Sequence, residues 1–273
     1  MSRIEARFKA LAKQGKKALI PYIVTGDPSA EITVPLMHAL VEAGADILEL
    51  GVPFSDPMAE GPVIQRAHER ALANGISLRK ALAAVEEFRQ SDQETPVLLM
   101  GYANPVLHMG YAAFADAAAA VQLDGLLTVD IPPEEVADVN LELNRVGIDN
   151  IFLVAPTTPD ARVGVITQQA SGFIYCVAVK GVTGSGNLDA GQVAKKVKII
   201  REHTSLPIAV GFGIKDAKSA ASISVCADGV VVGSALVQRV ADVIDAGGSQ
   251  EAAIAAAVTL IADIRRGIDD VTS

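Results

Sequence analysis

The sequence contains no uninterrupted apolar run of the length that a membrane-spanning helix needs, so we expect none. Residues 1–9 also lack the apolar core of a signal peptide. They predict instead a short amphipathic helix with Ile4, Phe8 and Leu11 on one face. Cysteine is scarce as well: Cys176 and Cys226 are the only two, and both lie in apolar runs that resemble strands. We expect both to be small buried side chains in a protein of the reducing cytoplasm.

Basic residues and histidines are also few. The chain has 23 Lys and Arg against 32 Asp and Glu, which gives a formal net charge of −9. This balance argues against nucleic acid as a partner, although a small anionic substrate can still bind where a site is locally positive. The four histidines, His38, His68, His108 and His203, show no spacing typical of metal ligands, so we expect no metal site.

Apolar residues, in contrast, make up half of the 273 residues. Eight short runs of β-type residues follow one another, and most are apolar without alternation. Parallel strands that are buried on both faces have this pattern. We place the strands at residues 18–24, 46–50, 96–101, 125–129, 150–154, 173–179, 207–210 and 229–232.

Helical patterns separate these runs. They cover residues 31–42, 63–73, 78–88, 111–121, 160–169, 190–203, 216–225 and 250–265. Ser77 is an expected N-cap, and one more helix is expected to open at Pro133 and end at Gly147. The alternation predicts a single (β/α)₈ barrel domain over residues 1–273, with extra helices at the N-terminus and after the second strand. A doubly wound open sheet is the alternative, but no Gly-x-Gly-x-x-Gly motif follows the first strand.

Two glutamates of the second β–α unit are candidate catalytic groups. Glu49 lies in the second predicted strand, and the loop after it carries Asp56 and Glu60. A carboxylate at a strand end that faces another on the next loop is suited to acid–base chemistry. An apolar pocket would raise the pKa of Glu49 and make it a general acid, while Glu60 stays ionised and holds a donor group of the substrate. Alternatively, Glu49 pairs with a basic residue and the loop acids are solvated.

Glycines after the last two strands predict a phosphate site. Gly211-Phe-Gly-Ile follows the seventh strand and Gly233-Ser-Ala-Leu follows the eighth. Barrels often bind phosphate there, at the start of a short helix. Glycine lets backbone N–H groups approach the phosphate, and Ser234 adds a hydroxyl. The loop of residues 180–187 would form a third wall. The alternative is that these are ordinary turn glycines.

Apolar and aromatic residues gather at the predicted strand ends: Tyr22, Met100, Tyr102, Tyr175 and Phe212. Such a lining fits a flat apolar ligand such as an aromatic ring, although core packing would explain each residue singly. Lys180, just past the sixth strand, is placed where a Schiff-base aldolase has its lysine. We favour a solvated lysine in a loop too mobile to desolvate it.

Motifs in order along nearly the whole chain resemble those of the tryptophan synthase α subunit family. The most specific is Leu-Glu-Leu-Gly-Val-Pro-Phe-Ser-Asp-Pro at residues 48–57. The others lie at residues 61–65, 100–105, 128–132, 153–159, 181–184, 211–214 and 232–237. The resemblance implies a (β/α)₈ barrel that cleaves indole-3-glycerol phosphate to indole and glyceraldehyde 3-phosphate, a retro-aldol lyase reaction of tryptophan biosynthesis.

The resemblance also implies residue roles. Glu49 matches the family's general acid–base, which moves protons at indole C3 and the glycerol hydroxyl, and we expect Glu60 and Tyr175 to be catalytic residues with it. The expected substrate-binding residues are Tyr22, Ile64, Met100, Tyr102, Thr183, Gly184, Phe212, Gly213, Gly233 and Ser234. The surface that meets a β subunit is expected at Asp56, Pro57, Asn104 and Pro132. That partner carries pyridoxal phosphate and receives indole through a tunnel in an α₂β₂ assembly, whereas this chain needs no cofactor.

One residue departs from the family pattern. The family has aspartate where this chain has Glu60, and that aspartate accepts the indole N–H bond and stabilises positive charge on the ring. Glutamate moves the charge outward by one methylene, and a misplacement of about 1 Å can cost on the order of 10²-fold in rate. A chain that mainly binds and activates the β subunit is therefore an alternative. Tyr22 and Met100 stand where the family more often has Phe and Leu, and the Tyr22 hydroxyl needs a partner if it is buried.

Overall fold

Eight parallel strands close into a barrel in the order of the sequence, from β1 next to β2 around to β8 next to β1. The computed structural model describes residues 1–178, 190–211 and 213–272. The strands are β1 (Ala18–Val24), β2 (Leu48–Gly51), β3 (Val97–Gly101), β4 (Gly125–Thr128), β5 (Asp149–Val154), β6 (Ile174–Val177), β7 (Ile208–Gly211) and β8 (Gly229–Val232). Each overlaps one predicted run, so the (β/α)₈ barrel is confirmed and the open sheet is wrong.

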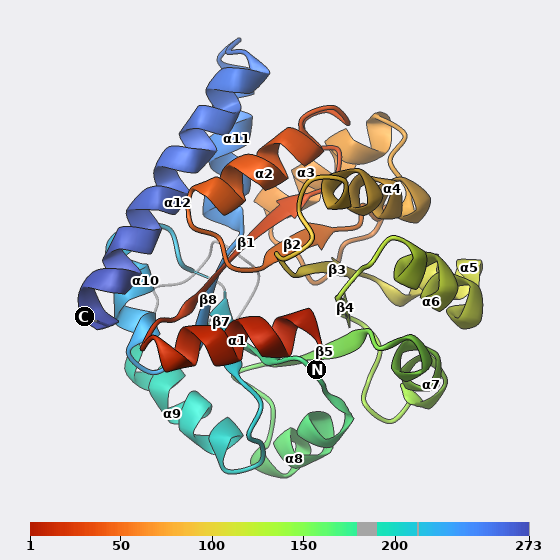
Figure 1. Ribbon diagram of the computed structural model, residues 1–273, viewed down its shortest axis with the longest axis vertical. Coiled ribbons are helices and arrows are strands. Elements are labelled where there is room, and N and C mark those ends of the chain that lie inside the picture. Colours follow the sequence, from red (N-terminus) through yellow and green to blue (C-terminus); the bar gives the residue numbers. More distant parts are fainter. Residues whose placement is uncertain (179–189, 212, 273) are drawn as a thin grey trace.

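Helices surround the barrel (Figure 1). Those of its first half are α1 (Arg3–Lys13), α2 (Thr33–Glu42), α3 (Pro62–Ala73), α4 (Leu78–Arg89), α5 (Ala103–Met109) and α6 (Tyr111–Ala120). Those of its second half are α7 (Ala137–Val146), α8 (Asp160–Gln169), α9 (Ala190–Arg201), α10 (Ala217–Ser224), α11 (Ser234–Asp245) and α12 (Gln250–Thr272). The extra helices predicted at the N-terminus and after the second strand are α1 and α3.

Several local predictions need correction. The helix expected to open at Pro133 begins at Ala137, because Pro132 and Glu135 close a turn through a backbone hydrogen bond of 3.0 Å. Helix α12 continues past residue 265, and Gly267 inside it allows close contact with the backbone of Ala217 on α10. Ser77 is the N-cap of α4, but its side chain makes no capping bond.

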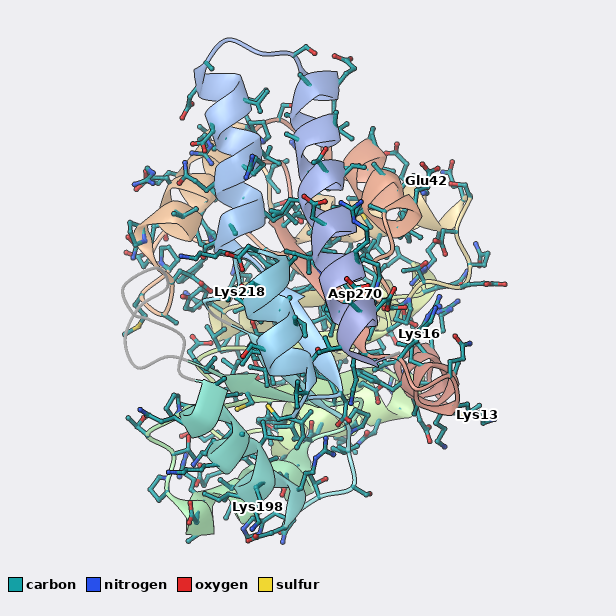
Figure 2. All side chains as sticks on the ribbon, turned by 90° about the vertical axis from the view of Figure 1, so that its left-hand side faces the viewer. Lys13, Lys16, Glu42, Lys198, Lys218 and Asp270 are labelled. Carbon is teal, nitrogen blue, oxygen red and sulfur yellow. The ribbon has the colours of Figure 1, made fainter. Side chains whose placement is uncertain are left out.

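The sequence interpretation missed helices α5 and α11. Helix α5 is short and has a proline in its first turn, and α11 begins inside the glycine motif that was interpreted only as a phosphate site. Figure 2 shows α11 and α12 running side by side. The charged side chains of Lys218 on α10 and Asp270 on α12 are exposed. Cys226 follows α10 instead of lying in a strand and is half-buried, whereas Cys176 is buried in β6 as expected.

Side chains of the strands alternate between two apolar cores. Outward residues such as Leu50, Leu99 and Val230 pack against the helices, and inward residues such as Leu98 and Val231 fill the barrel. Helix α1 closes the amino-terminal end of the barrel with the face predicted for it, and its Ile4, Phe8 and Leu11 join the inner core. The rings of Phe8 and Phe173 lie 5.7 Å apart.

Candidate active site

Glu49 lies inside the barrel, in β2, where a charge has little to stabilise it. Its side chain is 1% exposed, and neither carboxyl oxygen has a hydrogen-bond partner within the part of the chain that the structure describes. Burial, and then the charge of Glu60, raises the pKa of Glu49 to about 8. The ion pair with a basic residue that we considered from the sequence is not present among the described residues. Glu49 is therefore a neutral acid at pH 7 that can give up its proton.

Glu60 lies at the end of the loop that follows β2, immediately before the N-cap of α3. It is 5% exposed, and burial raises its pKa to about 7. The backbone N–H of Glu60 bonds to Pro57, and its carbonyl accepts from the side chain of Gln65, so the backbone around it is fixed. Burial is the cause of the raised pKa at Glu60, whereas at Glu49 the charge of Glu60 adds to burial and further disfavours the ionised form.

Tyrosines surround the acid pair. Tyr22 is the cross-strand neighbour of Glu49 in the β1–β2 register, and Tyr175 lies in β6. Burial raises the pKa of both hydroxyls well above the usual range, and the charges of Glu49 and Glu60 raise both further. Met100 and Ile64 belong to the same inner core, and Tyr102 is buried at the end of β3. Of the predicted apolar lining, Tyr22, Met100, Tyr102 and Tyr175 are thus buried, and Phe212 lies outside the described residues.

Two glycines make room for these tyrosines. A Cβ atom on Gly51 would overlap the hydroxyl of Tyr22, and one on Gly211 would overlap the hydroxyl of Tyr175. Gly211 therefore makes room for Tyr175. The sequence offered no signal for this pairing, because it depends on which strands lie side by side.

The start of α11 has the features of an anion site. Gly233 is its N-cap, without any side-chain capping bond, and Gly213 after β7 has a positive φ of 84°. The hydroxyl of Ser234 is buried and has no partner among the described residues. Free N–H groups at a helix start, together with an unused hydroxyl, suit a phosphate. Of the predicted site, Lys180, Thr183, Gly184 and Phe212 lie outside the described residues.

The residues predicted to meet a partner lie on the loops after β2 and β4 and at the start of helix α5. Asp56, Asn104 and Pro132 are exposed, and Pro57 is partly exposed. The hydroxyl of Tyr102 accepts from the N–H of Ala59 at 3.0 Å, which ties the loop after β2 to the end of β3. Asp130 accepts from the N–H of Ala103 at 2.8 Å, which ties the loop after β4 to α5. Two large apolar side chains are exposed nearby, Met58 at 82% and Leu107 at 52%.

His68 is a residue of this site that the sequence analysis considered only as a metal ligand. It lies on α3 and is 2% exposed. Its Nδ1 accepts from the N–H of Phe54 at 3.0 Å, and its Nε2 lies 3.4 Å from the hydroxyl of Tyr22. Its position one helical turn after the buried Ile64 is a signal that could have placed it on the inward face of α3.

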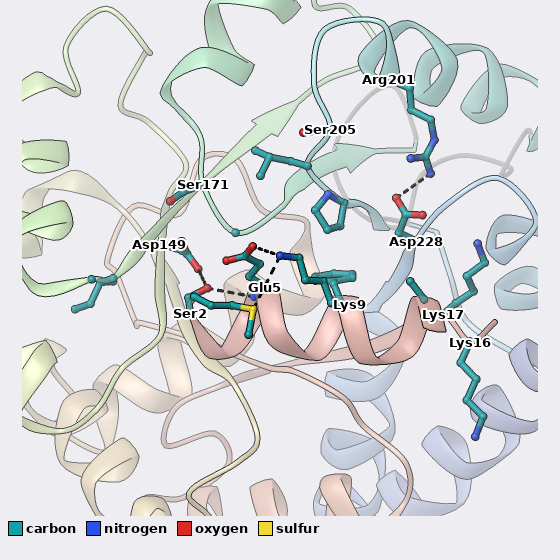
Figure 3. Close-up of a pocket in the computed structure, with 18 of the residues that line it drawn as sticks. Ser2, Glu5, Lys9, Lys16, Lys17, Asp149, Ser171, Arg201, Ser205 and Asp228 are labelled. Atoms are coloured by element: carbon teal, nitrogen blue, oxygen red, sulfur yellow. Dashed lines mark hydrogen bonds and ion pairs between the residues drawn. The ribbon is translucent and has the colours of Figure 1, made fainter. Parts of the chain in front are cut away.

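A pocket of about 1030 Å³ lies at the opposite, amino-terminal end of the barrel, beside α1 (Figure 3). Its polar groups bond to one another. Ser2 donates to Asp149 at 2.6 Å, and Arg201 pairs with Asp228 at 2.8 Å. Within residues 1–178, 190–211 and 213–272, no cluster of His, Cys, Asp or Glu is suited to hold a metal ion, and no helix is long and apolar enough to cross a membrane.

The closed barrel of eight parallel strands, with two buried glutamates in its second β–α unit, defines a (β/α)₈ protein. Comparison with known proteins gives the particular family. The sequence profile of the tryptophan synthase alpha chain matches residues 8–265, and the chain belongs to this family.

Its relatives agree along almost the whole chain. The tryptophan synthase alpha chain of Thioalkalivibrio sulfidiphilus is 61% identical over 89% of this chain and 91% of its own length. That of Dechloromonas aromatica is 54% identical over 99% of both chains. The crystal structure of tryptophan synthase subunit alpha from Legionella pneumophila superposes with a TM-score of 0.92 at 43% identity, over 99% of both chains.

Proposed function

We propose that this chain cleaves indole-3-glycerol phosphate to indole and glyceraldehyde 3-phosphate, as the α chain of a tryptophan synthase. Family membership and relatives up to 61% identical support the reaction. The single structural observation that supports it most is Glu49, a buried acid with a pKa of about 8 and no partner among the described residues. We further propose that residues 1–273 act as one barrel domain, since all eight strands belong to one closed barrel.

The proposed chemistry needs one group that both gives and takes a proton. Glu49 donates its proton to indole C3 and accepts one from the hydroxyl on the adjoining carbon of the glycerol chain. The carbon–carbon bond then breaks, its electron pair returns to the ring, and the hydroxyl carbon becomes the aldehyde. All atoms of the substrate end in the two products. A carboxyl with a pKa near the working pH is efficient in both directions.

Glu60 is proposed to accept the hydrogen bond of the indole N–H. Protonation at C3 places positive charge on the ring, and a nearby carboxylate stabilises that charge. The pKa of Glu60 is raised to about 7, and a donor from the substrate would favour its ionised form. We propose that Tyr22, Ile64, Met100, Tyr102, Tyr175 and Phe212 surround the indole ring. We propose that Gly213, Gly233 and Ser234 hold the phosphate, and that Thr183 and Gly184 close over the substrate.

The exposed surface of Asp56, Pro57, Asn104 and Pro132 is proposed to bind a β subunit, in an α₂β₂ assembly in the cytoplasm. The exposed Met58 and Leu107 supply apolar area there, as expected for a protein interface. We propose that pyridoxal phosphate belongs to that partner and that this chain uses no cofactor of its own.

Steady-state indole release from indole-3-glycerol phosphate, with and without saturating β subunit, tests the proposal. We expect release by the chain alone and faster release with the partner. Absence of indole under both conditions would favour the alternative of a chain that only binds and activates its partner. Borohydride treatment with substrate tests the Schiff-base alternative at Lys180, and we expect no covalent adduct.

A further inference from the structure

The hydroxyl of Tyr22 has an arrangement that barrel packing alone does not require. The ring is 5% exposed and belongs to the inner core, where a phenylalanine would fill the same space. The hydroxyl lies over β2 at Gly51, where only a glycine leaves room for it. Tyr22 and Glu49 are direct neighbours across the two strands. Within the described residues, no hydrogen bond joins the Tyr22 hydroxyl to Glu49, but the Tyr22 ring is the strand neighbour of the carboxyl that is proposed to move protons.

His68 determines which way the hydroxyl proton of Tyr22 points. The N–H of Phe54 can only donate, so Nδ1 of His68 accepts from it and the ring proton lies on Nε2. Burial lowers the pKa of His68 to about 4, so the ring is neutral at pH 7. The Nε2–H then donates to the hydroxyl oxygen of Tyr22 across 3.4 Å. The proton of Tyr22 must therefore point away from His68.

Glu49 lacks a hydrogen-bond donor of this kind among the described residues. Neither of its oxygens has a partner among the described residues, and an ionised carboxylate in an apolar site is costly without a hydrogen bond. Burial raises the pKa of the Tyr22 hydroxyl well above its usual range, and the charges of Glu60 and Glu49 raise it further. Tyr22 offers a proton that His68 leaves free.

We propose that His68 positions the hydroxyl of Tyr22 as a hydrogen-bond donor to the Glu49–Glu60 pair, and that this donor stabilises the ionised carboxylate formed during cleavage. Tyr22 is the group that would touch the reacting acid, and His68 is a positioning residue that acts through it. The inference rests on the proposed function for its role in turnover. The proton affinity of the two carboxyls, however, is a property of the free chain and can be measured without substrate.

The test is a ¹³C NMR titration of the glutamate carboxyls in the intact chain, compared between Tyr22→Phe and the wild type. The variants Glu49→Gln and Glu60→Gln identify which signals belong to the two acids. Loss of a donor to the charged form raises the pKa of a carboxyl. We expect the pKa of the acid pair to rise by about one unit, the value of one hydrogen bond to a charged group. Tyr111→Phe removes a hydroxyl far from the acids and is the matched control.

The pH profile of indole release extends the test to turnover. In Tyr22→Phe we expect the alkaline limb of kcat to move to higher pH by about one unit and kcat to fall about tenfold, with KM little changed. His68→Leu should shift the alkaline limb by the same amount in the wild type, but should cause no further shift in the Tyr22→Phe background. His68→Gln can both accept and donate a hydrogen bond, so its limb should lie between those of His68→Leu and the wild type. A purely structural histidine would lower the melting temperature without moving the limb.

Unchanged carboxyl titrations in Tyr22→Phe would overturn the proposal, even if His68→Leu failed to fold. A rise in KM with an unmoved pH limb would also overturn it, because the hydroxyl would then bind substrate instead of the acids. If the wild type released no indole while the carboxyl titrations shifted as expected, the proposed function would fail and the assignment of Tyr22 would stand.

Discussion

The buried carboxyl groups at the amino-terminal end of this barrel contrast with Glu49 near its carboxyl end. At the amino-terminal end, Asp124 pairs with Arg89 at 2.6 Å and Arg3 at 2.9 Å and accepts from the N–H of Val97. Asp46 likewise accepts from a backbone N–H and pairs with Arg265 at 3.1 Å.

At the carboxyl end, Glu49 has no partner in the described part of the chain. An acid that is fully bonded holds strands in place, whereas an acid without bonds keeps a proton that it can transfer. The same side-chain chemistry therefore stabilises the amino-terminal end and, as we propose, supplies the acid of the reaction at Glu49.

Glu49→Gln should have the largest effect on activity of the variants considered, while leaving the ion pairs at the amino-terminal end unchanged. The amide has the shape of the acid but no proton to give, so we expect indole release to fall by at least about 10³-fold, near the upper range for general acid–base catalysis. The amino-end ion pairs do not change, and binding of inorganic phosphate should persist. Steady-state assays and phosphate titration measure both. Wild-type turnover in this variant would remove Glu49 from the mechanism.

The same variant should be more stable than the wild type at alkaline pH. The pKa of Glu49 is about 8 in the fold against 4.5 in the unfolded chain. The fold therefore resists ionisation, and its stability falls as pH rises from 4.5 toward 8. The free energy of unfolding of Glu49→Gln relative to the wild type should rise over this window, by on the order of 3–5 kcal/mol. Urea unfolding at pH 5 and pH 8 gives the comparison, and a pH-independent difference would contradict it.

Asp124→Ala makes the complementary change at the amino-terminal end. It leaves the buried guanidinium of Arg89, which is 3% exposed, without its charge partner. Breaking a buried pair in this way costs about 3–5 kcal/mol. We expect a lower urea midpoint and nearly unchanged kcat for the molecules that stay folded. A large loss of kcat with an unchanged midpoint would show that the two ends are coupled.

Ser234→Ala and Glu60→Asp probe smaller effects at the carboxyl end. Loss of the unpartnered Ser234 hydroxyl should raise KM about tenfold with kcat retained, the value of one hydrogen bond to a charged group. Glu60→Asp restores the family's residue and should give equal or higher activity. A loss of more than tenfold would instead show that the loop after β2 is built around glutamate. Initial rates over a range of substrate concentration measure both variants.

The amino-acid pattern predicted most of this fold, because buried parallel strands are continuous apolar runs and their helices are amphipathic. It also placed Glu49 and Glu60 in the correct unit, since an acid in an apolar run is conspicuous. It could not reveal that Gly51 and Gly211 make room for tyrosine hydroxyls, or that His68 bonds to Tyr22. These facts depend on contacts between different strands and helices, and nothing in the local sequence encodes them.

Helix α1, which closes the amino-terminal end of the barrel, has a consequence for how the chain folds. This helix is synthesised before the elements on which it packs, because Phe8 packs on Phe173 and Arg3 pairs with Asp124, both far along the sequence. β1 in turn pairs with β8. The interior of the barrel therefore cannot be sealed on the ribosome until β8 has emerged. Until then the apolar face of α1 is exposed, which makes the nascent chain a natural client for a chaperone.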